Sequence, residues 1–292
     1  MGPRIVLDLV RTAERRAAPQ DDLPAAETWQ ERSRPMIRAM SGRVALHGGG
    51  EFLPGDEPFL SALLEAAAGS ADARGSGEPI RVVVVPTAAA RHNPDAASRV
   101  GASAFQRVAD TGRPIHVETA RVVDAASADD PRTAERLESA DLIYLPGGDP
   151  DMIPTLFPGT GAWRAIEAAH LRGAVLAGAS AGAMGLCRLT WTPDGIRPGL
   201  DIVHGLVVFP HADAQMWVRQ TAWFTMATAA GVGVLGIGER TGVISPPCDG
   251  EGHRNGGTAT WQVVGEQEVR WLPPGATKPA ILTHGATIEL PA

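Results

Sequence analysis

The sequence contains few cysteines, which cross-link many secreted proteins, and no long apolar run of the kind that anchors membrane proteins. Only two of its 292 residues are cysteines, Cys187 and Cys248, which excludes a disulfide framework, and their spacing is not the C-x-x-C of a zinc or redox site. No stretch approaches the ~18 consecutive apolar residues of a membrane helix, and the first residues carry no long apolar run typical of a secretory signal. We therefore expect a protein of the reducing cytoplasm that does not associate with a membrane.

Positive charge is also scarce. The chain has 26 basic and 33 acidic residues, a formal net charge of −7, and Lys278 is its only lysine. Binding to a phosphate backbone needs clustered Lys and Arg, so we do not expect nucleic acid as a partner. The H-E-x-x-H zinc motif, Cys/His clusters and phosphate-binding loops are missing, so we expect no metal and no other cofactor.

Apolar runs alternate with helical patterns from about residue 43 onward. Residues 1–40 mix Arg, acidic residues and Pro without a sustained period. We therefore predict that they are a disordered extension, or that the natural protein starts at a later methionine. We predict a single α/β domain over 41–292. Strands that are apolar throughout and separated by helices are typical of a parallel sheet covered on both faces. We predict strands at 44–46, 80–85, 115–117, 142–145 and 174–177, and helices at 59–68, 94–110, 133–140, 162–172 and 181–189.

The pattern changes after residue 201. Apolar segments at 202–209, 234–237 and 243–244 surround a predicted helix at 215–230. Three later segments alternate polar with apolar residues, which predicts strands with one solvated face. We expect 258–264 to pair with 268–272 and 286–290. The predicted fold is a three-layer α/β/α sandwich with a mostly parallel sheet and an antiparallel C-terminal edge.

Three predicted strands end in turns rich in glycine, and open parallel sheets bind ligands at the carboxyl ends of their strands. The most specific turn matches G-x-S-x-G between a strand and a helix, where small residues allow a sharp bend that exposes Ser180 as a nucleophile. The helix that follows would favour negative charge near Ser180. The turns are His47-Gly48-Gly49-Gly50-Glu51, Pro146-Gly147-Gly148-Asp149 and Gly178-Ala179-Ser180-Ala181-Gly182-Ala183.

The same turns supply candidate partners for Ser180. Two convergent backbone N–H groups form an oxyanion hole, and we assign these donors to Gly148 and Ala181. We expect Glu51 to face a cationic group of the substrate or to cap the next segment. The expected substrate-binding residues are Gly49, Gly50, Glu51 and Asp149.

A serine nucleophile needs a general base, which is normally a histidine oriented by a carboxylate. Among eight histidines, His211 directly follows an apolar run and is our candidate, while His204 at the other end of that run is the alternative. Glu239 follows the predicted strand 234–237 in the same way and is our candidate orienting acid, with Asp213 second.

Together these motifs resemble the cyanophycinase and aspartyl dipeptidase family of serine peptidases, which has a class I glutamine amidotransferase-like fold. The resemblance covers 43–290 and rests on the three turns, on 199–201 leading to His211, and on 235–241, in the family's order. It implies Ser180 as nucleophile, His211 as base, Glu239 as orienting acid, an acyl-enzyme, and small aspartyl or isoaspartyl peptides as substrates. Where cyanophycinases usually have Gln, this chain has Pro150, and their Asp-Gln-His-Phe is here Phe209-Pro210-His211-Ala212.

Two other functions fit part of the pattern. An α/β-hydrolase esterase has similar glycine and serine motifs, but its chain order of Ser, acid, His would require residues such as Asp249 and His284. A non-catalytic binding protein with the same fold is the second alternative. The reactivity of Ser180 separates the enzymes from the binding protein. A small peptide is the expected partner, and the sequence leaves open whether the chain forms a homodimer.

Overall fold

The computed structural model describes residues 42–75, 77–109, 113–192, 195–247 and 257–291. The predicted extension 1–40, Cys248 and Asp249 lie outside these residues.

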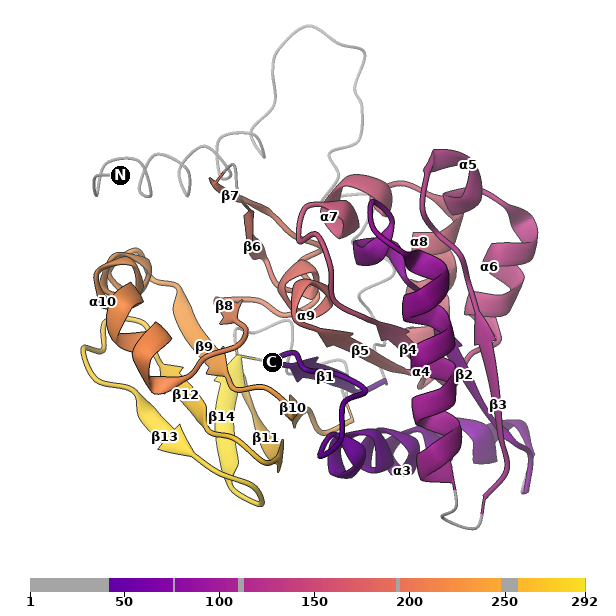
Figure 1. Ribbon diagram of the computed structural model, residues 1–292, viewed down its shortest axis with the longest axis horizontal. Helices are drawn as coiled ribbons and strands as arrows, with labels where there is room; N and C mark the ends of the chain where they lie inside the picture. The colour runs from indigo at the N-terminus through magenta and orange to yellow at the C-terminus, as the bar shows by residue number, and fades with distance from the viewer. Residues whose placement is uncertain (1–41, 76, 110–112, 193–194, 248–256, 292) are drawn as a thin grey trace, which may run out of the picture.

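An eight-stranded sheet forms the centre of the molecule, in the order β14-β11-β10-β1-β5-β4-β2-β3 (Figure 1). Neighbouring strands from β1 to β3 in this order run parallel, whereas β10, β11 and β14 are antiparallel. The predicted mostly parallel sheet with an antiparallel C-terminal edge is therefore confirmed. The strands are β1 (Val44–His47), β2 (Ile80–Val84), β3 (Ile115–Thr119), β4 (Leu142–Leu145), β5 (Val175–Ala179), β10 (Thr241–Ile244), β11 (Thr258–Gly265) and β14 (Thr287–Pro291).

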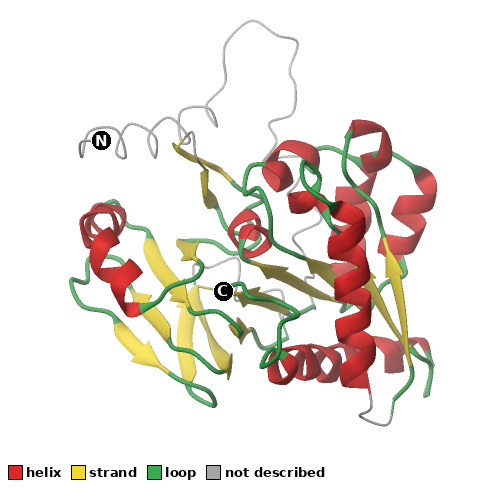
Figure 2. Cartoon of the chain, in the orientation of Figure 1, coloured by secondary structure: helices red, strands yellow, loops and turns green. Residues whose placement is uncertain are grey.

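Helices cover both faces of this sheet, which is why β1, β4 and β5 are buried along their whole length (Figure 2). On one face, Phe59 and Phe105 pack with Tyr144 of β4 in a common apolar cluster. The helices of that face are α3 (Glu57–Arg74) and α4 (Pro94–Val108), with η2 (Thr87–Ala89) before α4. The other face carries α5 (Ala125–Ala128), α6 (Pro131–Glu138), α7 (Met152–Leu156), α8 (Gly161–Leu171) and α9 (Ala181–Leu186).

A second sheet of four strands, in the order β13-β12-β9-β8, was not predicted. Its β8 and β9 are parallel neighbours, and α10 (Ala214–Ala229) covers it with Trp217 and Phe224. The remaining strands, β6 (Leu189–Thr192) and β7 (Gly195–Pro198), form a separate hairpin. The strands of the second sheet are β8 (Leu206–Phe209), β9 (Gly233–Ile237), β12 (Val269–Leu272) and β13 (Ala280–Leu282).

The expected pairing of 258–264 with 268–272 is wrong. β11 pairs with β10 and β14 in the main sheet, whereas β12 pairs with β9 and β13 in the second sheet. Alternation indicates that a segment is a half-buried strand but carries no information about its partner. The chain crosses from the second sheet to the main sheet between β9 and β10, and back between β11 and β12.

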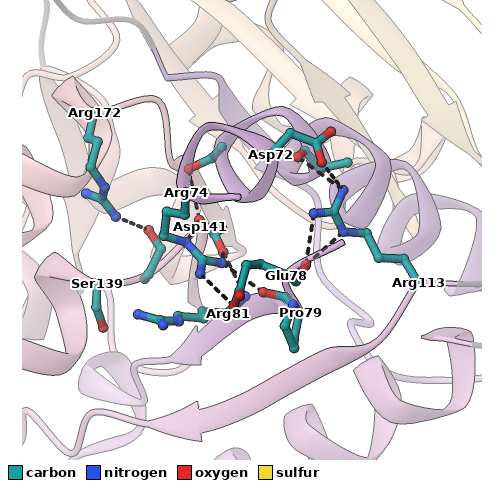
Figure 3. A network of polar contacts seen from close by, with 12 residues as sticks. Asp72, Arg74, Glu78, Pro79, Arg81, Arg113, Ser139, Asp141 and Arg172 are labelled. Carbon is teal, nitrogen blue, oxygen red and sulfur yellow. Dashed lines mark hydrogen bonds and ion pairs between the residues drawn. The ribbon is translucent and has the colours of Figure 1, made fainter. Parts of the chain in front are cut away.

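An ion pair joins the amino ends of β2 and β4 to α3 (Figure 3). Asp141, which directly precedes β4, is fully buried and accepts hydrogen bonds from Ser70 Oγ (3.0 Å), Arg74 Nε (3.1 Å) and the Arg81 N–H (2.9 Å). The contact with Asp141 raises the pKa of Arg74. This network lies at the end of the sheet opposite to the glycine turns.

Candidate active site

Ser180 occupies the sharp bend between β5 and α9. Its backbone has φ 48° and ψ −113°, a strained conformation that bulkier surroundings would not permit. A methyl group on Gly178 would lie 2.5 Å from the Gly182 carbonyl carbon, and one on Gly182 would lie 2.0 Å from Leu145 O. The small residues therefore let α9 approach the end of β4, and with it the second glycine turn.

Ser180, His211 and Glu239 form one chain of polar contacts. Ser180 Oγ lies 3.0 Å from His211 Nε2, and His211 Nδ1 lies 2.9 Å from Glu239 Oε1. Because a carboxylate only accepts, Nδ1 carries the proton of a neutral ring, and Nε2 is then free to accept the serine proton. The His211 and Glu239 side chains are 44% and 48% exposed, so their attraction contributes little to stability and mainly orients the ring.

These three residues come from two different sheets. Ser180 follows β5 of the main sheet, whereas His211 and Glu239 follow the adjacent parallel strands β8 and β9 of the second sheet. Carboxyl ends of neighbouring parallel strands lie at one edge, which is why the base and the acid meet although 28 positions separate them.

The alternative residues make other contacts. Asp213 Oδ1 accepts the Met216 N–H at the start of α10, and His204 Nδ1 lies 2.8 Å from Asp201 Oδ1. His284, which the esterase alternative would use as base, accepts the Gly265 N–H with its Nδ1. None of the three replaces His211 or Glu239 in the chain of contacts with Ser180.

The backbone N–H groups of Gly148, in the second glycine turn, and of Ala181, next to Ser180, have no acceptor among the residues that the structure describes. Gly148 has φ +150°, and a methyl group there would lie 2.2 Å from Ala88 O. Only glycine therefore fits this turn. Ala181 is the first residue of α9, so its N–H is one of those that a helix leaves unpaired.

The first glycine turn lies against the histidine and the glutamate. A methyl group on Gly49 would lie 2.2 Å from His211 Cε1, and one on Gly50 would lie 3.1 Å from Glu239 Cβ. Glu51 Oε1 accepts the Gly147 N–H at 2.7 Å. Asp149, at the end of the second turn, lies 3.2 Å from His92 Nε2.

One supporting residue was missed from the sequence. Arg270 of β12 is buried and donates from Nη1 to the carbonyl of Ala212 (2.9 Å), directly after His211. It also pairs with Glu268. No local pattern could have indicated this contact, because it depends on β12 joining the second sheet.

Within the described ranges, no group of three or more His, Cys, Asp or Glu residues is arranged to hold a metal ion. No helix in the same ranges is long and apolar enough to cross a membrane.

Known proteins resemble this chain in sequence and in fold. The model of peptidase family S51 matches residues 65–244, a segment that contains Ser180, His211 and Glu239. The crystal structure of a peptidase from an acI-B1 actinobacterium is similar, with 26% identity and a TM-score of 0.65, covering 87% of this chain and 98% of that one. A candidate peptidase E from Listeria monocytogenes EGD-e has 15% identity and a TM-score of 0.46, with coverages of 80% and 98%. No curated protein matches the chain.

The S51 match extends over more than half of the sequence and includes the turn that carries Ser180. The chain therefore belongs to peptidase family S51 and is a serine-type peptidase.

Proposed function

We propose that Ser180, His211 and Glu239 are the catalytic triad of this serine peptidase. The observation that supports it best is the unbroken chain of contacts from Ser180 Oγ through both ring nitrogens of His211 to Glu239, at 3.0 and 2.9 Å. These lengths lie within the range expected of a nucleophile, its base and the group that orients the base.

In this proposal, His211 Nε2 takes the proton of Ser180 Oγ while Oγ attacks the carbonyl carbon of the scissile peptide bond. The imidazolium then gives that proton to the leaving amine as the C–N bond breaks, which leaves an acyl-enzyme on Ser180. A water molecule deprotonated by His211 hydrolyses the ester and restores the serine. Glu239 keeps the ring in the required tautomer throughout.

The N–H groups of Gly148 and Ala181 are the proposed oxyanion hole. Their lack of any acceptor among the described residues supports this role, because a preorganised donor must be available when the tetrahedral oxyanion forms. One such donor typically contributes about 10²–10³ in rate.

Small peptides, including aspartyl and isoaspartyl dipeptides, are the proposed substrates. Glu51 supports recognition of a free amine, since one carboxylate oxygen is held by Gly147, beside Ser180, and no described basic residue pairs with it. Asp149 and the glycines at 49 and 50 would border the same site. We place the activity in the cytoplasm because the cysteine content is low and Cys187 is buried with no disulfide partner among the described residues.

A fluorophosphonate probe tests the triad directly. The wild-type protein should be labelled, and Ser180→Ala should not be labelled at all. His211→Ala should lose labelling, whereas His204→Ala, which removes the other candidate base, should keep it. Labelling that survives in Ser180→Ala, or that is lost in His204→Ala but not in His211→Ala, would overturn the assignment.

A substrate screen tests the proposed specificity. Asp-X dipeptides, their N-acetylated forms, isoaspartyl peptides and short nitrophenyl esters are compared, each with Ser180→Ala as the blank. Cleavage of free aspartyl dipeptides supports the proposal. Glu51→Gln should reduce the rate of this cleavage, whereas the acetylated dipeptides should be cleaved slowly by both the wild type and the variant. Turnover of esters alone would favour the esterase alternative, and no labelling with no turnover would favour a binding protein.

A further inference from the structure

Three consecutive carbonyl groups at the end of β1 accept backbone N–H groups of Ser180, of His211 and of the residue after Glu239. The Ser180 N–H donates to His47 O (2.9 Å), the His211 N–H donates to Gly48 O (2.8 Å), and the N–H of Arg240, next to Glu239, donates to Gly49 O (2.8 Å). This segment, residues 47–49, thus bridges the two sheets and sets the spacing between nucleophile, base and acid.

The side chain of His47 holds this segment in place. Its Nδ1 accepts the Gly49 N–H at 3.3 Å, so the proton of a neutral ring lies on Nε2. The ring is fully buried and lies against Phe59, with the ring centres 4.6 Å apart. Gly49 in turn leaves no room for a side chain between itself and the His211 ring.

Asp56 is the partner that fixes the His47 ring. His47 Nε2 lies 2.9 Å from Asp56 Oδ1, the distance of an ion pair, and neither atom has a hydrogen-bond partner among the described residues. The other oxygen, Oδ2, accepts the Phe52 N–H at 2.8 Å. Asp56 therefore closes the loop 48–56 on itself, and both Asp56 and His47 are almost completely buried.

Asp56 lies at the amino end of a long helix. It directly precedes α3, a helix of 18 residues, whose amino end carries partial positive charge. A carboxylate 2.9 Å from Nε2 favours the ring form that has its proton on Nε2, and that leaves Nδ1 as an acceptor for the Gly49 N–H. The carboxylate thus selects the tautomer that the glycine turn requires.

We propose that the buried pair of His47 and Asp56 positions the triad. The pair acts through the carbonyl groups of residues 47–49 and through Gly49. This inference rests on the proposed catalytic triad. Neither residue contacts Ser180 Oγ, the His211 ring or Glu239 through its own polar atoms, so the pair takes no part in proton transfer. Both residues also lie outside the segment matched by the family model.

Asp56→Asn is the main test, because it keeps the shape and replaces one acceptor oxygen with an NH₂ donor. If the new amide oxygen accepts the Phe52 N–H, the NH₂ group faces His47 Nε2. The ring proton must then move to Nδ1, where it repels the Gly49 N–H. In the opposite orientation the NH₂ group repels the Phe52 N–H instead. We expect kcat and the rate of fluorophosphonate labelling to fall by at least about tenfold with little change in KM, since misplacement of reacting groups costs this much or more.

Ser70→Ala is the matched control, since it also removes a partner of a buried carboxylate, at the opposite end of the sheet. It should lower the melting temperature but leave kcat unchanged. All rates are measured well below the melting temperature of each variant. An Asp56→Asn variant whose kcat falls no further than that of Ser70→Ala would overturn the inference.

A second comparison remains decisive if Asp56→Asn does not fold. His47→Asn places an amide oxygen near the position of Nδ1 and can still accept the Gly49 N–H, whereas His47→Leu has similar bulk and no acceptor. We expect labelling by His47→Asn to be at least about tenfold faster than by His47→Leu, and equal rates would contradict the inference. A wild-type protein that is not labelled at Ser180 would overturn the triad itself, and with it this inference.

Discussion

Gly49→Ala is the substitution for which the structure predicts the largest loss of activity without any change to a reacting group. The new methyl group would lie 2.2 Å from His211 Cε1, whereas carbon atoms in contact are normally about 3.5–4.0 Å apart. The ring or the glycine turn must therefore move by more than about 1 Å. Ser180 Oγ and His211 Nε2 lie 3.0 Å apart in the native protein. A shift of this size would move them beyond hydrogen-bonding distance.

A displacement of this size typically costs about 10² in rate, so we expect labelling and peptide turnover by Gly49→Ala to fall by about this factor. The backbone also contributes, because Gly49 has φ +106° and a non-glycine residue in such a conformation costs about 1–3 kcal/mol. Stopped-flow or gel-based labelling with a fluorophosphonate probe measures the rate, and thermal melting measures the stability.

Gly231→Ala separates the two effects. Gly231 has φ +82°, but nothing lies within 4 Å of an added methyl group. It should lose a similar amount of stability through backbone strain and keep full activity. If Gly49→Ala reacts nearly as fast as Gly231→Ala, the contact between the glycine turn and His211 does not control the position of the ring.

Further predictions concern groups away from the site. Asp141→Asn should lower the free energy of unfolding by about 3 kcal/mol, because it breaks a buried ion pair with Arg74; urea denaturation measures this, and unchanged kcat at low urea should accompany it. Burial raises the pKa of Glu167 above its usual 4.5, so the folded state favours the protonated form, and the stability that this contributes is present below the usual pKa and lost as the pH rises. Glu167→Gln should therefore raise the melting temperature at neutral pH and have little effect in acid. Burial raises the pKa of Cys187 to about 12, so iodoacetamide should modify it in the unfolded protein only; fast modification of the native protein would contradict this.

The sequence predicted much of the fold because its strands are short apolar runs bounded by helices and turns. The same reasoning indicated where Ser180, His211 and Glu239 would lie, since each directly follows such a run and parallel strands end at one edge. The structure brings these three side chains into one chain of contacts.

What the sequence could not predict depends on contacts between distant segments. The apolar runs before His211 and Glu239 give no sign that they form a second sheet, and the short turn after β11 imitates a hairpin although β12 pairs elsewhere. The glycines at 49 and 50 indicate a close approach but not which residues approach them. In the structure they face His211 and Glu239.

The distribution of the proposed triad over two sheets has a consequence for the newly made protein. Ser180 directly follows β5, the last parallel strand of the main sheet in chain order. Its base and acid lie 31 and 59 positions further along the chain, on strands that must first pair with one another. A ribosome-bound chain that has folded only its parallel sheet would display the serine without a base. The peptidase would remain inactive during synthesis and would become competent only when the C-terminal strands have docked.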